Sequence, residues 1–290
     1  LLGVSAGDVI VCSTGLIGTG DEVFRAKVLT GVEEGIAALS DEGGAAASEA
    51  IMTTDSKAKR SVRTQAGWTI GGMAKGAGML APGLATMLVV ITTDAVLTAA
   101  GADAHLRAAT RVSFDRLDSD GCMSTNDQVT LMVSGASGIA PDADAFRETL
   151  TAVCLDLAAQ LQADAEGAAH DITIRVANAA SEDDAVDVGR SVARNNLFKA
   201  AIFGNDPNWG RVLAAIGTTA AKFDPYDVDV WMNGVRVCTA GGPDRPREEV
   251  DLTPRATELV IDLKVGAASA TILTNDLTHD YVHENSAYSS

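Results

Sequence analysis

An uncharged stretch at residues 76–93 constrains the fold of this chain more than any other segment. Its length approaches the roughly 20 apolar residues that a membrane-spanning helix needs. Glycine and proline, however, interrupt its first half, residues 76–83, and a segment so interrupted makes a poor membrane helix. The β-branched run in its second half predicts a buried strand over 86–93, entered from a Gly/Pro turn. We therefore expect a soluble protein whose core contains this strand.

The charge balance excludes several classes of partner. The 290 residues carry 22 Lys and Arg against 39 Asp and Glu, a formal net charge of −17. Such a chain repels phosphate backbones and anionic lipid headgroups, so neither nucleic acid nor a membrane is an expected partner. The four cysteines show no disulfide or metal-binding spacing, and no signal-peptide pattern opens the chain. These features indicate a reducing, cytoplasmic compartment.

Periodicity predicts a mixture of helices and strands, with enough apolar residues for one large domain or two lobes. Helices are expected over 21–38, 45–51, 103–114, 142–166, 182–201 and 209–216. Strands are expected over 9–12, 61–65, 68–75, 86–93, 129–133 and 172–176, with hairpins between 228 and 273. Residues 275–290 are polar and aperiodic, and from the residues alone 285–290 are expected to fray. This mixture, without regular βαβ alternation or a long linker, predicts an α/β (α+β) layered sandwich.

Two short motifs have weak functional interpretations. Residues 76–81 match the dinucleotide fingerprint G-x-G-x-x-A, but Pro82 follows where the phosphate-binding helix would have to begin. The acidic segment 118–127 lacks the Glu that an EF-hand calcium loop needs at its twelfth position. We interpret this segment as polar packing and assign it no catalytic role.

Longer motifs, distributed in order along the whole chain, resemble those of one enzyme family. They are CSTGLIG at 12–18, AIMTTD at 50–55, KGAGMLAP at 75–82, ATML at 85–88, STND at 124–127, QADAEG at 162–167, NDPNWGR at 205–211 and ENSAYSS at 284–290. The chain is similar to the ornithine acetyltransferases, also called glutamate N-acetyltransferases, the bifunctional acetyltransferases of arginine biosynthesis. Family members carry a further segment before the position of Leu1, so the resemblance implies that an N-terminal part is missing here.

The resemblance implies a self-processing enzyme of the N-terminal-nucleophile type. Cleavage between Ala85 and Thr86 would give two subunits. Residues 1–85 would be the C-terminal part of the α subunit, and residues 86–290 would be the β subunit. Two copies of each would assemble as a heterotetramer. A threonine hydroxyl is a poor nucleophile, but a terminal Thr86 offers its own α-amine, of reference pKa about 7.7–8.0, as a general base. Without the resemblance, Thr86 is an ordinary β-former at the start of a strand.

The resemblance also implies the reaction and its site. Thr86 would take the acetyl group from N-acetylornithine and pass it to glutamate in a ping-pong reaction, with no metal or organic cofactor; acetyl-CoA is left open as a further acetyl donor. Thr14 and Gly15 correspond to the oxyanion hole. The substrate-binding positions carried over are Thr53, Lys75, Thr86, Glu166, Asn285 and Ser290. The Lys75 ammonium suits a substrate α-carboxylate, and the Glu166 carboxylate suits the ammonium of ornithine.

Two alternatives stay open at this stage. An aminopeptidase-like hydrolase of the same fold would use water in place of glutamate as the acceptor. An inactive, truncated remnant would leave the bond between Ala85 and Thr86 uncut. From the residues alone, Glu166 is the end of a solvated helix and Thr14-Gly15 an ordinary turn.

Overall fold

The computed structural model describes residues 1–16, 18–81, 87–124 and 126–287. The N-terminal segment contains a 3-10 turn, η1 (Ala6–Asp8), and two helices, α1 (Glu22–Ala37) and α2 (Gly44–Ala50). The prediction of α1 is confirmed, and the carboxylate of Asp21 caps it by accepting a 2.8 Å hydrogen bond from the Phe24 amide. The predicted strand at 9–12 is wrong: these residues are exposed, and no strand of the described residues pairs with them to supply hydrogen bonds.

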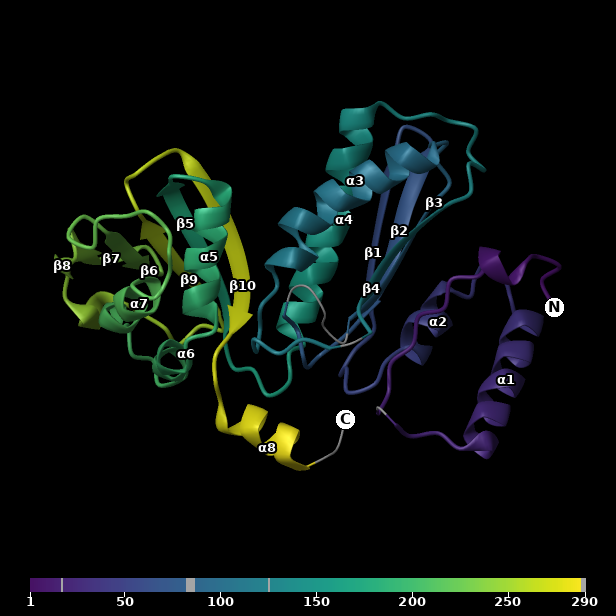
Figure 1. The fold of residues 1–290 in the computed structure, drawn as a ribbon, viewed down its shortest axis with the longest axis horizontal. Coiled ribbons are helices and arrows are strands. Elements are labelled where there is room, and N and C mark those ends of the chain that lie inside the picture. The colour runs from purple at the N-terminus through teal and green to yellow at the C-terminus, as the bar shows by residue number, and fades with distance from the viewer. Residues whose placement is uncertain (17, 82–86, 125, 288–290) are drawn as a thin grey trace.

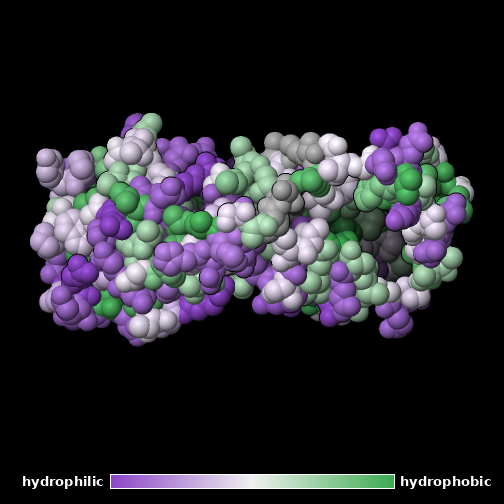
Figure 2. All heavy atoms as spheres, turned by 90° about the horizontal axis from the view of Figure 1, so that it is seen from below, coloured by the Kyte–Doolittle hydropathy of each residue, from purple (hydrophilic) through white to green (hydrophobic). Residues whose placement is uncertain are grey.

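Apolar side chains of α1 lie on the surface. Phe24, Val23 and Leu29 are all more than half exposed. Figure 2 shows apolar residues gathered at this end of the molecule, beyond the first sheet. No helix in the described residues is long and apolar enough to cross a membrane.

The first sheet has the strand order β1 (Lys59–Gln65), β2 (Trp68–Lys75), β3 (Leu88–Thr93), β4 (Gln128–Val133). The three strands β1, β2 and β3 are antiparallel neighbours, whereas β3 and β4 run parallel. A parallel pair needs a crossover, which α3 (Ala99–Val112) and the 3-10 turn η2 (Phe114–Arg116) supply. The predicted strand over 86–93 is confirmed from Leu88 onward; residues 82–86 lie outside the described residues.

Helix α4 (Ala143–Ala163) packs with α3 against this sheet (Figure 1). Its buried stripe includes Phe146, Leu150 and Leu157, and the Phe146 ring lies 5.5 Å from that of Trp68 on β2. The spacing is that of an amphipathic helix with one face turned to the core. Because α4 ends at Ala163, three residues before the predicted end, Glu166 stands in the following turn and not on a solvated helix face.

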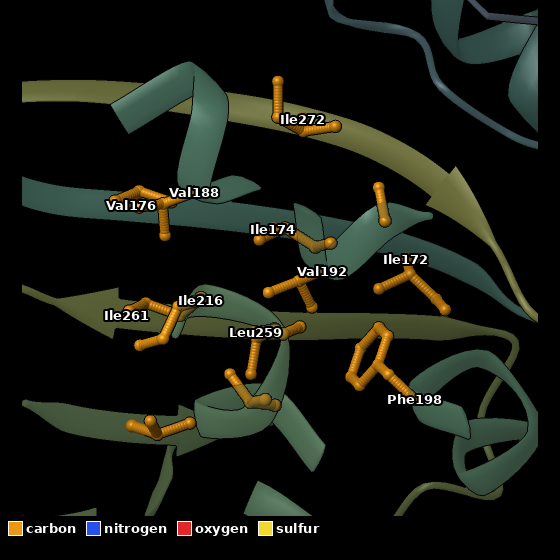
Figure 3. Close-up of a cluster of buried hydrophobic side chains, with 14 of the residues drawn as sticks. Ile172, Ile174, Val176, Val188, Val192, Phe198, Ile216, Leu259, Ile261 and Ile272 are labelled. Atoms are coloured by element: carbon orange, nitrogen blue, oxygen red, sulfur yellow. The ribbon is translucent and has the colours of Figure 1, made fainter. Parts of the chain in front are cut away.

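The second sheet has its own core. Its strand order is β10 (Ala268–Asn275), β5 (Asp171–Ala179), β9 (Ala256–Asp262), β6 (Asp229–Met232), β7 (Val235–Thr239), β8 (Gly242–Pro243). Three helices, α5 (Glu182–Ala193), α6 (Asn196–Phe203) and α7 (Trp209–Ile216), cover one face, and the 3-10 turn η3 (Arg247–Glu249) precedes β9. Figure 3 shows Val188 and Val192 of α5 gathered with Ile174 and Ile272 of the sheet. Burial of each such aliphatic side chain contributes about 1.5–3 kcal/mol to the stability of the fold.

Three predictions for this half need correction. The helix expected over 182–201 divides into α5 and α6, because the Asn195 side chain caps a new helix by accepting from the Phe198 amide at 2.9 Å. The hairpins expected between 228 and 273 are confirmed at β6–β7 and β7–β8, whereas β9 and β10 flank β5, one parallel and one antiparallel. The stretch 275–290, read as aperiodic, holds regular structure: Asn275 ends β10, and α8 (His279–Ala287) follows.

Polar and apolar contacts join the two halves. Buried Gln162, at the end of α4, donates to the backbone carbonyls of Ile172 and Thr274 in the second sheet, at 3.0 and 2.8 Å. Leu117 forms a β-bridge with Leu273. Helix α8 then returns from the second sheet below α4 (Figure 1). The layered α/β class is confirmed, with one core for each sheet.

Candidate active site

The candidate site lies at the end of the first sheet where β2 finishes and β3 and β4 begin. The register places Lys75 opposite Leu88, and Leu88 opposite Gln128. Met87 and Asp127, the residues before β3 and β4, therefore meet at this edge. The Lys75 side chain, which is 1% exposed, belongs to the same edge.

Hydrogen bonds to several other parts of the chain hold the segment before residue 82. The Gly76 and Met79 amides donate to the carboxylates of Asp55 (2.6 Å) and Asp120 (2.8 Å). The carbonyls of Ala77 and Leu80 accept from the Glu166 (2.9 Å) and Ser119 (2.7 Å) amides. These partners come from both sides of the segment in sequence, so the chain that leads into residues 82–86 has little conformational freedom.

A buried cluster of charges supports Lys75. The Lys59 ammonium contacts Asp55 Oδ1 at 2.7 Å and Asp164 Oδ2 at 2.5 Å, and the Lys75 ammonium lies 3.7 Å from Asp55 Oδ2. Burial lowers the pKa of Lys75, while the charge of Asp55 opposes that shift. Burial also disfavours ionised Asp55, but hydrogen bonds from Gly76 and Lys59 outweigh it and hold the pKa of Asp55 below its usual range. The cluster thus presents a desolvated cation at the sheet edge.

Glu166 connects three segments of the chain. Its Oε1 accepts a 2.8 Å hydrogen bond from the Thr54 hydroxyl, and its Oε2 accepts a 3.1 Å hydrogen bond from the Asn285 amide on α8. A Cβ on Gly78 would lie only 2.5 Å from Glu166 Oε2, so glycine is required for this close approach. Two cavities, of about 420 and 220 Å³, share Glu166 in their linings.

Four of the predicted binding residues are therefore brought together. The Thr53 amide donates to Asp55 Oδ2 at 3.1 Å, next to Lys75, while Glu166 and Asn285 contact each other directly. The exposed position of Asn285 on a helix explains why its neighbourhood looked like a solvated tail. Thr86, Ala85 and Ser290 lie outside the described residues.

The predicted oxyanion loop reaches the same edge of the sheet. The Asn126 side-chain amide donates to the carbonyl of Ser13 at 2.9 Å, which anchors the residue preceding Thr14 and Gly15 beside β4. Thr14 is half-buried and Gly15 is exposed. The structure thus brings this loop close to Asp127, although more than 100 residues separate them in sequence.

Sequence reasoning missed Asp127. Its Oδ1 accepts a 2.8 Å hydrogen bond from the Met87 amide, and burial raises its pKa to about 6. The available signal was a carboxylate two residues before the predicted strand at 129–133, in a motif interpreted as polar packing. No group of His, Cys, Asp and Glu able to hold a metal ion occurs among the described residues.

Comparisons with known proteins identify the family of this chain. The model of the ArgJ family matches residues 1–290. The arginine biosynthesis bifunctional protein ArgJ of Streptomyces coelicolor is 62% identical over 100% of this chain and 75% of its own length. That of Mycobacterium leprae is 51% identical over 98% of this chain and 70% of its own length.

A solved structure shares the fold. The crystal structure of the arginine biosynthesis bifunctional protein ArgJ from Bacillus halodurans has a TM-score of 0.65 and 31% sequence identity, covering 69% of this chain and 98% of that chain. The layered α/β architecture expected from the resemblance is therefore confirmed. With a family model that matches from end to end and relatives above 50% identity, the chain belongs to the ArgJ family.

Proposed function

We propose that this chain catalyses ping-pong transfer of an acetyl group from N-acetylornithine to glutamate, yielding ornithine and N-acetylglutamate in arginine biosynthesis. The observation that carries the proposal is the family match over the whole chain, at 62% identity to a named ArgJ protein. The convergence of Thr53, Lys75, Glu166 and Asn285 at one edge supports it. We assign the reaction to the cytoplasm, because the four cysteines are free thiols.

Thr86 is the proposed nucleophile, first toward its own chain. Its hydroxyl attacks the carbonyl carbon of Ala85, the peptide nitrogen departs as the amine of residue 86, and water hydrolyses the resulting ester. The products are residues 1–85, which end in a carboxylate, and residues 86–290, which begin with a free α-amine. We propose that the two pieces stay associated and that two of each form a heterotetramer.

The freed amine then serves as the base in acetyl transfer. The Thr86 hydroxyl attacks the acetyl carbonyl while its proton passes to the α-amine; the C–N bond breaks, and ornithine leaves with that proton. The amine of glutamate attacks the acetyl ester, gives a proton to the α-amine, and restores the hydroxyl. Thr14 and Gly15 are assigned to the oxyanion, where one donor is typically worth about 10²–10³ in rate. The chemistry needs no cofactor, and acetyl-CoA is a candidate second donor.

Charge assigns the substrate contacts. Both substrates carry an α-carboxylate, and the desolvated Lys75 ammonium is suited to bind it. Glu166, which lines both cavities, is suited to bind the side-chain ammonium of ornithine. Thr53, Asn285 and Ser290 complete the proposed binding set.

The test is Thr86→Ala, with Thr92→Ala as its control because Thr92 is an exposed threonine on β3. Intact mass and N-terminal sequencing are expected to show two chains for wild type and Thr92→Ala, and one uncut, inactive chain for Thr86→Ala. Full activity of Thr86→Ala, or an active wild type that is uncut, would overturn the proposal. Ornithine release that does not depend on glutamate would instead favour the hydrolase alternative.

A further inference from the structure

Asp127 clamps the backbone next to the proposed nucleophile. Its Oδ1 accepts from the Met87 amide at 2.8 Å, while the Met87 carbonyl accepts from the Gln128 amide at 3.0 Å. Both peptide groups of Met87 are thus bonded to the chain that enters β4. The Met87 amide is part of the peptide bond to residue 86, so Asp127 holds the first peptide group of the proposed 86–290 chain.

Covalent bonds to Met87 limit how far the α-nitrogen of residue 86 can lie from this carboxylate. Three bonds separate it from the Met87 nitrogen, so the two nitrogens lie within about 4 Å of each other in any conformation. A carboxylate oxygen 2.8 Å from the Met87 nitrogen is therefore within about 7 Å of the α-amine. At this range a carboxylate in a partly desolvated site acts appreciably on a charged amine.

The surrounding charged groups leave the Asp127 carboxylate available to act on the α-amine of residue 86. Lys75 on β2 is the charged group that acts on Asp127, and Lys75 itself faces Asp55, Lys59 and Glu166. Among the described residues, the Met87 amide is the hydrogen-bond partner found for the Asp127 carboxylate. Burial raises its pKa to about 6, so the group is still largely ionised near pH 7.5.

We propose that Asp127 is a positioning residue of the acetyl transfer: it fixes the peptide group that follows Thr86 and stabilises the ammonium formed when the α-amine of Thr86 takes the hydroxyl proton. The proton moves from the hydroxyl to the amine and Asp127 stays ionised, so the carboxylate acts through its charge alone. This inference rests on the proposed role of Thr86. It assigns a task to the STND motif, for which polar packing was the sequence interpretation.

The decisive variant is Asp127→Asn. Its amide oxygen can still accept from Met87, so the chain is expected to fold and cleave, but the negative charge is lost. A nearby carboxylate raises the pKa of an ammonium; its loss is expected to move the acidic limb of the kcat/KM profile down by about one pH unit. The plateau of kcat is expected to fall at least about tenfold, with KM little changed. An acidic limb at the wild-type pH would overturn the inference.

Asp94→Asn is the matched control. Asp94 Oδ1 accepts from the Thr69 amide at 2.7 Å, which is the same kind of bond at the opposite end of the same sheet. This variant is expected to keep the wild-type pH profile. Asp127→Glu retains the charge and serves if Asp127→Asn does not fold: its acidic limb is expected to stay at the wild-type pH, and a shift of one unit would refute the inference.

The result for Thr86→Ala distinguishes a failure of the proposed function from a failure of the role proposed for Asp127. An active Thr86→Ala variant removes the proposed function, and this inference with it. If Thr86→Ala is inactive and uncut while Asp127→Asn keeps the wild-type pH profile, the proposed function stands and only the role of Asp127 is refuted.

Discussion

Replacing Lys59 by Met tests whether the buried charge cluster holds the candidate site together. The Lys59 side chain is 0% exposed and contacts Asp55 and Asp164, whose side chains are 0% and 5% exposed. Removing one partner of a buried ion pair costs about 3–5 kcal/mol, because the remaining charge stays desolvated. Asp55 keeps its bond from the Gly76 amide and Asp164 keeps a 3.0 Å bond from the Ser56 amide. Because these hydrogen bonds are retained, we expect Lys59→Met to lower the free energy of unfolding by about 3 kcal/mol, the lower end of that range.

Urea unfolding at pH 7.5, followed by tryptophan fluorescence, measures this loss. The Thr86→Ala background keeps each protein a single chain, so that unfolding is unimolecular. Arg63→Met is the control on the same strand, because its pair with Asp156 spans 4.0 Å between half-exposed side chains and is worth about 0–1 kcal/mol. A free energy of unfolding for Lys59→Met within 1 kcal/mol of that control would refute the reasoning.

Three further results are expected at the site. Gly78→Ala, whose Cβ would displace the Glu166 carboxylate, is expected to raise KM for N-acetylornithine about tenfold in steady-state assays; Gly71→Ala, which meets only ordinary contacts, should leave KM unchanged. Lys75→Met is expected to raise KM for both substrates by about 30-fold or more, and an unchanged KM would remove Lys75 from carboxylate binding. Because its folded pKa is lowered, Asp55 stabilises the fold at neutral pH, and this contribution is lost as pH falls through and below 3.8; acid titration of wild type against Asp55→Asn measures it.

Much of the N-terminal segment and the first sheet, with its helix α4, could be predicted from the local sequence pattern. The helix over α1, the strands β1, β2 and β4, and the apolar stripe of α4 each follow from periodicity within a single segment. The site residues could be proposed only by resemblance, because their chemistry depends on segments that meet in space. Glu166 is the clearest case: its partners Thr54 and Asn285 lie 112 and 119 positions away.

Other features escaped prediction for physical reasons. Alternation within β9 and β10 indicates strands but cannot say which strand they pair with, and the structure places both beside β5. Helix α8 could not be predicted from an apolar pattern, because none of its residues is buried. It is held by polar contacts such as the 2.9 Å hydrogen bond from the Tyr281 amide to the Thr278 hydroxyl. Asp127 carried only a weak signal, because its proposed role depends on the parallel pairing of β3 with β4.

The antiparallel pairing of β2 with β3 has a consequence for how the protein would refold. These strands lie on opposite sides of the proposed scission, so a cut between residues 85 and 86 turns one continuous sheet into a shared one, with two strands from each fragment. If the proposed cleavage occurs, the sheet would be assembled while its pieces are still tethered, and the tether would then be lost. Once denatured, the mature enzyme would have to find its other half by diffusion, so recovery should depend on protein concentration, whereas the uncut precursor refolds alone.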